Sequence, residues 1–248
     1  MQLFFDFPVN PRYGFDNFIV CGGNEIAYRF AMMLTQEDSH NLLYVYGPPG
    51  SGKTHLLSAF GKRFWSVSHQ GSLSNDEPVP YISFRDIEQL YGGEYLAEQA
   101  SRMAERFINA PALLIDDLHL IPDNGNLRVE LWQLFNDFFD KGKKIAITAD
   151  CTPREIPSLD DHLVSRLLWG LVARMDVSDD DSRRLIMKKL AEDRHISLPA
   201  DVIDYLLRQT RRDIPSLTEA LEILNRQSLS TGRKISLRLA RETFERKG

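Results

Sequence analysis

A glycine-rich octapeptide in the first quarter of the chain carries the residues best suited to bind phosphate. Its sequence is Gly47-Pro48-Pro49-Gly50-Ser51-Gly52-Lys53-Thr54. Glycines allow backbone N–H groups to turn inward around the β- and γ-phosphates of a nucleotide. Lys53 supplies a positive point charge to these phosphates, and the Thr54 hydroxyl can ligate Mg²⁺. The octapeptide therefore predicts a site for ATP or ADP with Mg²⁺.

The segments on either side of the octapeptide agree with a phosphate-binding loop. The apolar run 42–46 is typical of a buried strand, and the residues from Lys53 onward have a helical pattern. The N-terminus of that helix would add its partial positive charge to the same pocket. An ordinary glycine turn requires neither element, so the pattern favours phosphate binding.

Acidic residues follow two further apolar runs of the chain. Asp116 and Asp117 come directly after 112–115, and Asp150 comes soon after 144–148. In a parallel sheet the carboxyl ends of strands meet at one edge, where ligands bind. There Asp116 could ligate Mg²⁺, Asp117 could polarise the attacking water, and Asp150 could lie between that water and the γ-phosphate. The alternative is that all three are turn residues, because Asp is common where strands end.

Apolar runs alternate with amphipathic segments through the first two thirds of the chain. Strands are expected at 42–46, 81–84, 112–115 and 144–148, and helices at 25–34, 53–65, 87–90, 95–108 and 127–139. This alternation predicts an α/β domain with a parallel sheet in a three-layer sandwich. The polar stretch 66–80 is expected to be a flexible surface loop.

Beyond Arg174 the strand pattern stops and only helical patterns follow. They predict helices at 182–193, 200–208, 214–229 and 236–246. We expect a nucleotide-binding α/β domain at 13–175 and a small all-α domain at 176–248.

The composition is that of a globular protein without a strong charge-driven affinity for DNA. Of the 248 residues, 43% are hydrophobic and 26% are charged, and the formal net charge is −5. Non-specific binding to DNA phosphates is therefore not favoured. Cys21 and Cys151 lack the spacing of a metal site, and no apolar run is long enough to span a membrane. We expect a cytoplasmic protein with little direct DNA binding and no membrane contact.

The first twelve residues form an unusually apolar segment, which includes Leu3, Phe5 and Phe7. Two prolines within this segment and a glycine soon after it break any regular element. An exposed phenylalanine-rich segment usually has a partner surface. Alternatively, the three apolar side chains pack as an edge strand on their own domain, and composition leaves both possibilities open.

Five motifs, in order, resemble the AAA+ ATPase core of the DnaA family of bacterial replication initiators. They are 15–20, the octapeptide 47–54, 113–117, 147–157 and 165–171. The resemblance extends from about Phe15 to Leu224. By this resemblance, the nucleotide is contacted by Phe18, Val20, Gly47, Pro48, Gly50, Ser51, Gly52, Lys53, Thr54 and His55.

Two features shift the resemblance toward the short, Hda-like regulators of this family. The chain ends soon after the expected helical domain, so we expect no helix-turn-helix DNA-binding domain. Gln2, Leu3, Phe5 and Phe7 resemble the peptide by which such regulators dock on the replication sliding clamp. Such peptides insert a few apolar anchors into a pocket. The resemblance thus implies three partners: DnaA, the clamp (the β subunit of DNA polymerase III) and a second copy of this chain.

By the same resemblance, Arg166 is an arginine finger that reaches the γ-phosphate bound by a neighbouring subunit. A guanidinium fork suits the charge that develops on the transferring phosphoryl group, and such fingers are worth roughly 10³–10⁵ in rate. The alternative is a salt bridge between the core and the helical domain.

The chain departs from the family pattern at two positions. His162 stands where DnaA has a second arginine, as expected if assembly at an origin has been lost. Pro215 stands where the helical domain normally presents an arginine to the nucleotide. Either Arg211 or Arg212 replaces that arginine, or the helical domain does not sense the γ-phosphate and the chain's own hydrolysis is slow.

The resemblance implies a nucleotide-binding adaptor that docks on the DNA-loaded clamp, stimulates hydrolysis of DnaA-bound ATP and so prevents re-initiation. One alternative is a DnaA-like initiator or helicase-loading ATPase that assembles directly on DNA. Another is an interaction module whose loop no longer binds nucleotide, against which the intact Lys53, Thr54 and Asp116 argue. The sequence leaves open whether ADP or ATP is the working ligand and whether the protein is a monomer or a dimer.

Overall fold

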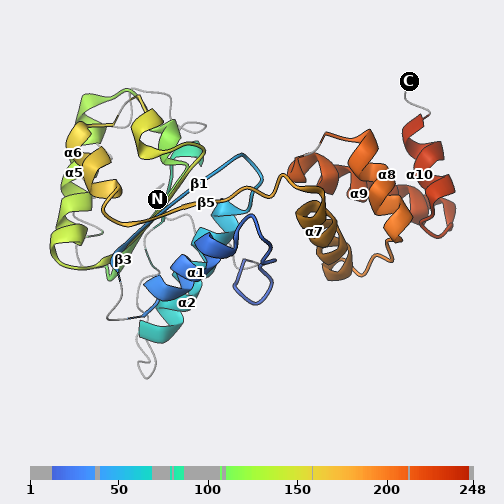
Figure 1. The fold of residues 1–248 in the computed structure, drawn as a ribbon, viewed down its shortest axis with the longest axis horizontal. Coiled ribbons are helices and arrows are strands. Elements are labelled where there is room, and N and C mark those ends of the chain that lie inside the picture. Colours follow the sequence, from blue (N-terminus) through green and yellow to red (C-terminus); the bar gives the residue numbers. More distant parts are fainter. Residues whose placement is uncertain are drawn as a thin grey trace, which may run out of the picture. The chain divides into compact units, whose positions relative to one another are not determined.

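The computed structural model describes residues 13–36, 40–68, 79, 81–86, 107, 110–157, 159–211 and 213–245. The chain divides into two compact units (Figure 1). The first unit contains the residues up to Met175, apart from two short segments. These segments, Ile19–Asn24 and Pro49–Ser51, belong to the second unit together with Asp176 and the residues that follow it.

A parallel sheet forms the centre of the first unit. Among the described residues it has five strands: β1 (Leu42–Tyr46), β2 (Tyr81–Ser83), β3 (Ala112–Asp116), β4 (Lys144–Ala149) and β5 (Leu171–Arg174). Their order across the sheet is β2-β3-β4-β1-β5, and every pairing is parallel. Tyr46 at the end of β1 pairs with Ala149 at the end of β4. The octapeptide and Asp150 therefore leave the sheet side by side.

Helices cover both faces of this sheet (Figure 1). Helices α1 (Glu25–Leu34) and α2 (Lys53–Ser68) share a buried apolar cluster with Leu43 and Val45 of β1. The alternate residues of the same strand, Leu42 and Tyr44, contribute to the cluster on the other face. This alternation follows from the two-residue period of a strand. It gives the three layers that the sequence predicts.

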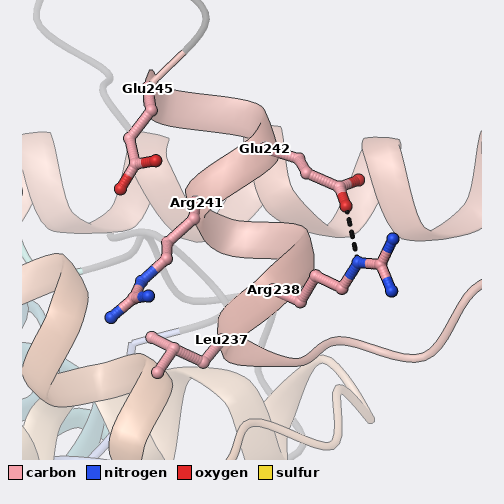
Figure 2. Close-up of a pocket in the computed structure, with 5 residues that line it drawn as sticks. All are labelled: Leu237, Arg238, Arg241, Glu242 and Glu245. Atoms are coloured by element: carbon pink, nitrogen blue, oxygen red, sulfur yellow. Dashed lines mark hydrogen bonds and ion pairs between the residues drawn. The ribbon is translucent and has the colours of Figure 1, made fainter.

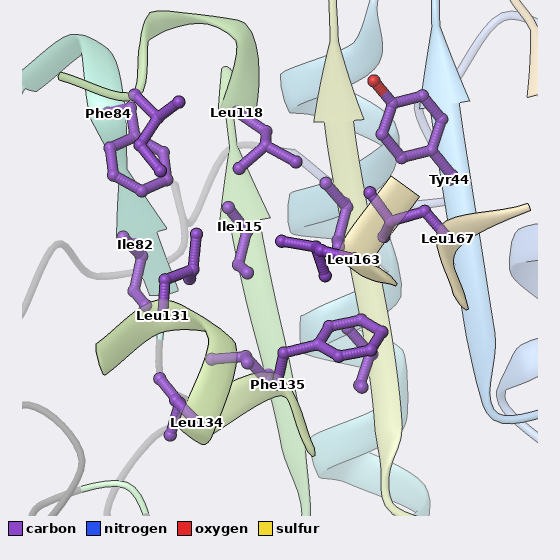
Figure 3. Close-up of a cluster of buried hydrophobic side chains, with 14 of the residues drawn as sticks. Tyr44, Ile82, Phe84, Ile115, Leu118, Leu131, Leu134, Phe135, Leu163 and Leu167 are labelled. Atoms are coloured by element: carbon purple, nitrogen blue, oxygen red, sulfur yellow. The ribbon is translucent and has the colours of Figure 1, made fainter. Parts of the chain in front are cut away.

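The second face is covered by α5 (Gly125–Asp140) and α6 (Asp161–Leu167). In Figure 3, Phe135 of α5 and Leu163 of α6 lie among side chains from the sheet. Helix α5 begins where the side chain of Asn124 accepts hydrogen bonds from two backbone N–H groups of the first turn. Two short 3₁₀ helices, η1 (Leu118–Leu120) and η2 (Pro153–Glu155), connect strands to these helices.

The described part of the second unit is helical beyond Asp176 and has an apolar core of its own. Its helices are α7 (Asp180–Asp193), α8 (Ala200–Gln209), α9 (Ile214–Thr231) and α10 (Leu237–Phe244). Met187, Leu206 and Leu224 are fully buried members of this core. Carboxylate N-caps begin α7 and α9, and a glycine in a left-handed conformation ends α9.

The predicted fold class, a parallel α/β sandwich followed by a small all-α domain, is confirmed. The predicted loop 66–80 starts too early, because α2 continues to Ser68. The predicted helix 87–90 lies outside the described residues, as does 95–108 apart from Phe107. In the part of the chain that the structure describes, no helix has the length and apolar content needed to cross a membrane.

Candidate nucleotide site and arginine finger

The octapeptide joins β1 to α2 through glycines that no larger residue could replace without strain. Gly50 and Gly52 have positive φ angles of 78° and 97°. A Cβ atom on Gly47 would lie 1.9 Å from the carbonyl oxygen of Met175. Helix α2 begins at Lys53, so the octapeptide ends in a first helical turn, where N–H groups can face an anion.

The loop also holds a buried polar atom that suits a phosphate ligand. Ser51 is 4% exposed, and its Oγ atom has no hydrogen-bond partner among the described residues. Buried polar groups without a partner are uncommon, and a missing ligand is one explanation. The glycine conformations, the helix start and Ser51 together fit a bound phosphate group.

The ammonium group of Lys53 contacts both the loop and the edge of the sheet. Its Nζ atom donates to the carbonyl oxygens of Gly47 at 2.7 Å and Pro48 at 3.0 Å. The same atom lies 2.8 Å from Oδ1 of Asp150. Lys53 is only 6% exposed, so its charge needs these partners. A positive charge is thereby fixed beside the loop.

Asp116 lies at the end of β3, and hydroxyl groups surround its carboxylate. Its Oδ2 atom accepts a hydrogen bond from the Tyr81 hydroxyl at 2.6 Å, and its Oδ1 atom accepts one from Thr148. The Thr54 side chain lies near enough to influence the pKa of this carboxyl group. Burial raises the pKa of Asp116 above its ordinary value, whereas the three hydroxyl groups act in the opposite direction. The two predicted Mg²⁺ ligands, Thr54 and Asp116, thus lie near one another.

Asp117 has an unusual backbone conformation and a partner that the sequence did not indicate. Its φ and ψ angles of 55° and 44° are left-handed, which is uncommon for a residue other than glycine. Oδ2 accepts a hydrogen bond from Nε of Arg85 at 2.7 Å, and this bond raises the pKa of the guanidinium. The backbone N–H donates to Oγ1 of Thr148 at 3.1 Å. The carboxylate predicted to polarise water is therefore paired with Arg85.

Asp150 contacts Lys53 on one side and His119 on the other. Its Oδ2 atom lies 3.2 Å from Nε2 of His119, and its backbone N–H donates to Nδ1 of the same ring at 3.2 Å. Ligand atoms of Asp117, His119 and Asp150 lie within 4.8 Å of one another. Oδ1 of Asp150 is paired by charge with Lys53, although it has no hydrogen bond of good geometry among the described residues, and Oδ2 faces His119, so a polar network describes this cluster. Sequence reasoning missed His119, whose one signal is its place two residues after the acidic pair.

Phe18 and His55 lie in an aromatic group beside the start of α2. The His55 ring stacks on Tyr13 at a centroid distance of 4.6 Å and meets Phe18 edge-on at 5.1 Å. Phe18 also stacks on Tyr28 at 5.7 Å. Val20 belongs to the second unit and is 39% exposed.

Arg166 on α6 is held against one side of α5. Its Nη1 atom donates to Oδ1 of Asn136 and lies 3.4 Å from Oδ1 of Asp140. The guanidinium carbon is 5.1 Å from the ring centre of Trp132 and 5.4 Å from that of Phe139. The side chain remains 27% exposed. The observed ion pair is thus internal to the first unit.

The two parts of the chain match two known family models. Residues 9–174 match the Bacterial DnaA ATPase domain, and residues 179–244 match the lid domain of Hda. The chain belongs to the bacterial DnaA ATPase family. The chromosomal replication initiator protein DnaA of Limosilactobacillus reuteri (strain DSM 20016) is 31% identical over 242 residues. That match covers 97% of this chain and 54% of the relative, so the chain spans about half the length of the curated DnaA proteins it matches.

Solved DnaA structures share this fold. Domain III of the Thermotoga maritima replication initiation protein DnaA superposes with a TM-score of 0.78 at 31% identity. This similarity covers 96% of the chain and 98% of domain III. AMPPCP-bound DnaA from Aquifex aeolicus gives a TM-score of 0.77 at 26% identity, with 96% of this chain and 69% of that protein covered. The α/β unit of the chain is therefore an AAA+ core of the DnaA type, and the helical unit is a lid.

Both departures from the DnaA pattern lie in ordered surroundings. Pro215 stands in the first turn of α9, where its missing N–H group costs no helical hydrogen bond. The helix is capped by Asp213, whose Oδ1 atom accepts from the N–H of Ser216 at 2.8 Å. The His162 ring lies 6.5 Å from that of Trp132. Arg211 is exposed, and Arg212 lies outside the described residues.

The N-terminal segment with Gln2, Leu3, Phe5 and Phe7 also lies outside the described residues. Its predicted role in clamp binding stays a prediction.

A hollow on the lid surface contains none of the predicted site residues. It is lined by Leu237, Arg238, Arg241, Glu242 and Glu245 of α10 and its end (Figure 2). Hydrogen bonds from Arg233 and Arg238 lower the pKa of Glu242 to about 2. None of the residues of the loop 47–54 lines this hollow, so the candidate nucleotide site lies elsewhere.

Proposed function

We propose that this chain is a nucleotide-binding AAA+ regulator of replication initiation, which stimulates hydrolysis of ATP bound to DnaA and so prevents re-initiation. The observation that carries the proposal is the Hda lid match at 179–244 behind a DnaA-type ATPase domain. The model that matches the lid is the one for Hda, which favours a regulator over an initiator.

In its own site, the chain would bind adenine nucleotide through the loop 47–54. Lys53 would direct its charge at the phosphates, and the Ser51 hydroxyl would gain a partner. Thr54 and Asp116 have the oxygen ligands that Mg²⁺ prefers. When bound there, Mg²⁺ would neutralise phosphate charge. The AMPPCP named for Aquifex DnaA supports an ATP-type ligand.

The chain's own ATP hydrolysis should be weak. Arg85 engages the carboxylate of Asp117, and a proline occupies the position of the lid arginine. ATP or ADP would then act mainly as a ligand that stabilises one conformation.

Arg166 would act on ATP held by DnaA rather than on the chain's own nucleotide. Helix α5 holds its guanidinium at a partly exposed position, close to the strongly exposed Trp169. Exposed tryptophan and arginine residues are enriched where proteins bind one another. The fork would stabilise the charge on the transferring phosphoryl group.

The N-terminal segment would dock the chain on the sliding clamp. Gln2, Leu3, Phe5 and Phe7 provide a few apolar anchors, which suit a pocket on such a partner. Docking on a DNA-loaded clamp and self-association would bring Arg166 to DnaA without a strong DNA affinity of its own.

The experiment compares hydrolysis of ATP pre-bound to DnaA with and without this chain and a DNA-loaded clamp. We expect the chain and the DNA-loaded clamp together to accelerate this hydrolysis. Gln2→Ala should remove the acceleration, because docking on the clamp is lost. Gln227→Ala on the lid is the matched control and should retain the effect. Hydrolysis that is unchanged by the chain at any clamp concentration would contradict the proposal.

A second candidate function is a DnaA-like initiator or helicase-loading ATPase that assembles directly on DNA. It is supported by the initiator names of the relatives and by a solved DnaA with AMPPCP and single-stranded DNA, which covers 96% of this chain at 25% identity. It predicts ATP-dependent binding to single-stranded DNA, which the net charge of −5 disfavours. Titration of a fluorescent oligonucleotide separates the two candidates.

A further inference from the structure

His119 holds Asp150 through both nitrogens of its ring. The backbone N–H of Asp150 donates to Nδ1 at 3.2 Å, so Nδ1 must carry a lone pair. In a neutral imidazole the proton then lies on Nε2, which faces Oδ2 of Asp150 at 3.2 Å. One tautomer therefore satisfies both contacts, and only a neutral ring can make both.

The ring is presented by a rigid piece of backbone. His119 is the middle residue of η1, which follows the left-handed Asp117. Two backbone hydrogen bonds close this turn, from Leu120 to Asp117 at 2.9 Å and from Ile121 to Leu118 at 3.1 Å. The Leu118 side chain is buried in the core. The position of the ring is thus set by the fold rather than by a mobile loop.

The contact with His119 affects the orientation of the Asp150 carboxylate and, through it, the charge that Lys53 offers to a ligand. Oδ1 of Asp150 lies 2.8 Å from Nζ of Lys53, while Oδ2 faces the histidine. With His119 absent, the carboxylate could rotate and offer both oxygens to the ammonium. The charge of Lys53 would then be neutralised more strongly and would be less available to phosphate.

We propose that His119 is a positioning residue that orients Asp150 and thereby sets how strongly the site distinguishes ATP from ADP. The inference rests on the proposed nucleotide binding at the loop 47–54. ATP carries more phosphate charge than ADP, and the lysine of such loops reaches the β- and γ-phosphates. Binding of ATP therefore depends on the charge of Lys53 more than binding of ADP does. Loss of His119 weakens the binding of ATP more than that of ADP.

The test measures Kd for Mg-ATP and Mg-ADP by calorimetry on the full chain and on His119→Ala and His119→Gln. For the alanine variant we expect the ratio Kd(ATP)/Kd(ADP) to rise roughly tenfold, the scale of one lost hydrogen bond to a charged group. Glutamine can accept from the N–H of Asp150 and donate to its carboxylate, so it should restore the ratio. His162→Ala on α6 is the matched control and should leave the ratio unchanged.

Each outcome is distinguishable from a failure of the proposed function. If the wild-type chain binds neither nucleotide, the proposed nucleotide site itself fails. If it binds both and the alanine variant shifts the two affinities equally, the positioning role is refuted while nucleotide binding stands. Nitrogen NMR of the free wild-type protein adds a readout that does not depend on nucleotide. A protonated Nδ1 in that spectrum would also overturn the proposal.

Discussion

Lys53 is the residue on which nucleotide binding should depend most, because its buried ammonium joins the loop to the sheet edge. We predict that Lys53→Ala lowers the affinity for Mg-ATP at least about 100-fold, since a charge-assisted contact to phosphate is lost. Calorimetry measures the change, with the exposed Lys188→Ala as the matched control. Affinity within threefold of wild type would show that the phosphates bind elsewhere.

Asp116 combines a cost to stability with a proposed role in Mg²⁺ binding. Burial disfavours its charged form, whereas an amide of the same shape could accept a hydrogen bond from one of the two hydroxyls, Tyr81 or Thr148, through its oxygen and donate to the other through its NH₂ group. We therefore predict that Asp116→Asn raises the melting temperature of the nucleotide-free protein. The same variant should lose the increase in nucleotide affinity that Mg²⁺ gives. Thermal melts and calorimetry with and without Mg²⁺ test both parts, and a lower melting temperature would contradict the first.

Single residues of the site differ in how far the sequence could predict their surroundings. The motif pattern predicted that Asp116 and Asp150 lie at one sheet edge beside the loop that carries Lys53, and the structure places them there. It could not identify Arg85 or His119. Arg85 reaches Asp117, and His119 reaches Asp150, from segments distant in sequence, and only the tertiary fold brings these pairs together.

Among the secondary-structure elements, α7 and α9 depend on carboxylate caps. The side chain of Asp179 accepts from Ser182 N–H, and that of Asp213 accepts from Ser216 N–H. Hydrogen bonds from the side chain and backbone of Ser182 lower the pKa of Asp179 below the ordinary value of 3.8, and those from the backbone and side chain of Ser216 lower that of Asp213. Each alanine substitution should cost about 1 kcal/mol of lid stability at neutral pH.

The pH dependence of this cost has a definite sign. A lowered pKa contributes stability that is present above the ordinary value of 3.8 and is lost as the pH falls through the lowered value. The difference in unfolding free energy between wild type and the Asp179→Ala or Asp213→Ala variant should therefore shrink in strong acid. Urea unfolding at neutral and acidic pH measures it, with the exposed Glu219→Ala as control. A gap that is constant with pH would show that the caps are not ionised partners.

Periodicity predicted long elements better than short ones. Helices α5 and α8 have apolar residues at clear helical spacing, and both were predicted. Strand β5 and helix α6 were not predicted. β5 has four residues and is only partly buried, and its partner is β1, so its existence depends on sheet pairing rather than on its own pattern. α6 has seven residues, which are too few for periodicity to distinguish a helix from a strand or a loop.

In the molecule as a whole, the two units have separate apolar cores. Phe135 lies in a core of the first unit and Leu224 in that of the second. We predict that Phe135→Ala destabilises the first unit by about 3–5 kcal/mol and Leu224→Ala the lid by about 2–5 kcal/mol, since each leaves a cavity. Each change should appear in its own thermal transition, and Mg-ATP should raise the first transition. One shared transition that both variants lower equally would argue against separate cores.

The chain corresponds to about half of a DnaA protein, and its proposed activity needs that larger relative as a partner. On this account the nucleotide site stabilises the chain itself, whereas Arg166 acts on ATP in a neighbouring DnaA molecule. Separate substitutions should therefore affect the two functions separately. This division is the central claim.

The most direct test is a single-turnover measurement of ATP hydrolysis on DnaA, with DNA-loaded clamp and either wild-type chain or Arg166→Ala. The account predicts that Arg166→Ala loses the stimulation, by roughly 10³-fold if the finger acts fully. It also predicts that the variant keeps its own nucleotide affinity and that Arg154→Ala, at another exposed arginine of the first unit, behaves like wild type. Stimulation by Arg166→Ala equal to that of wild type would contradict the account.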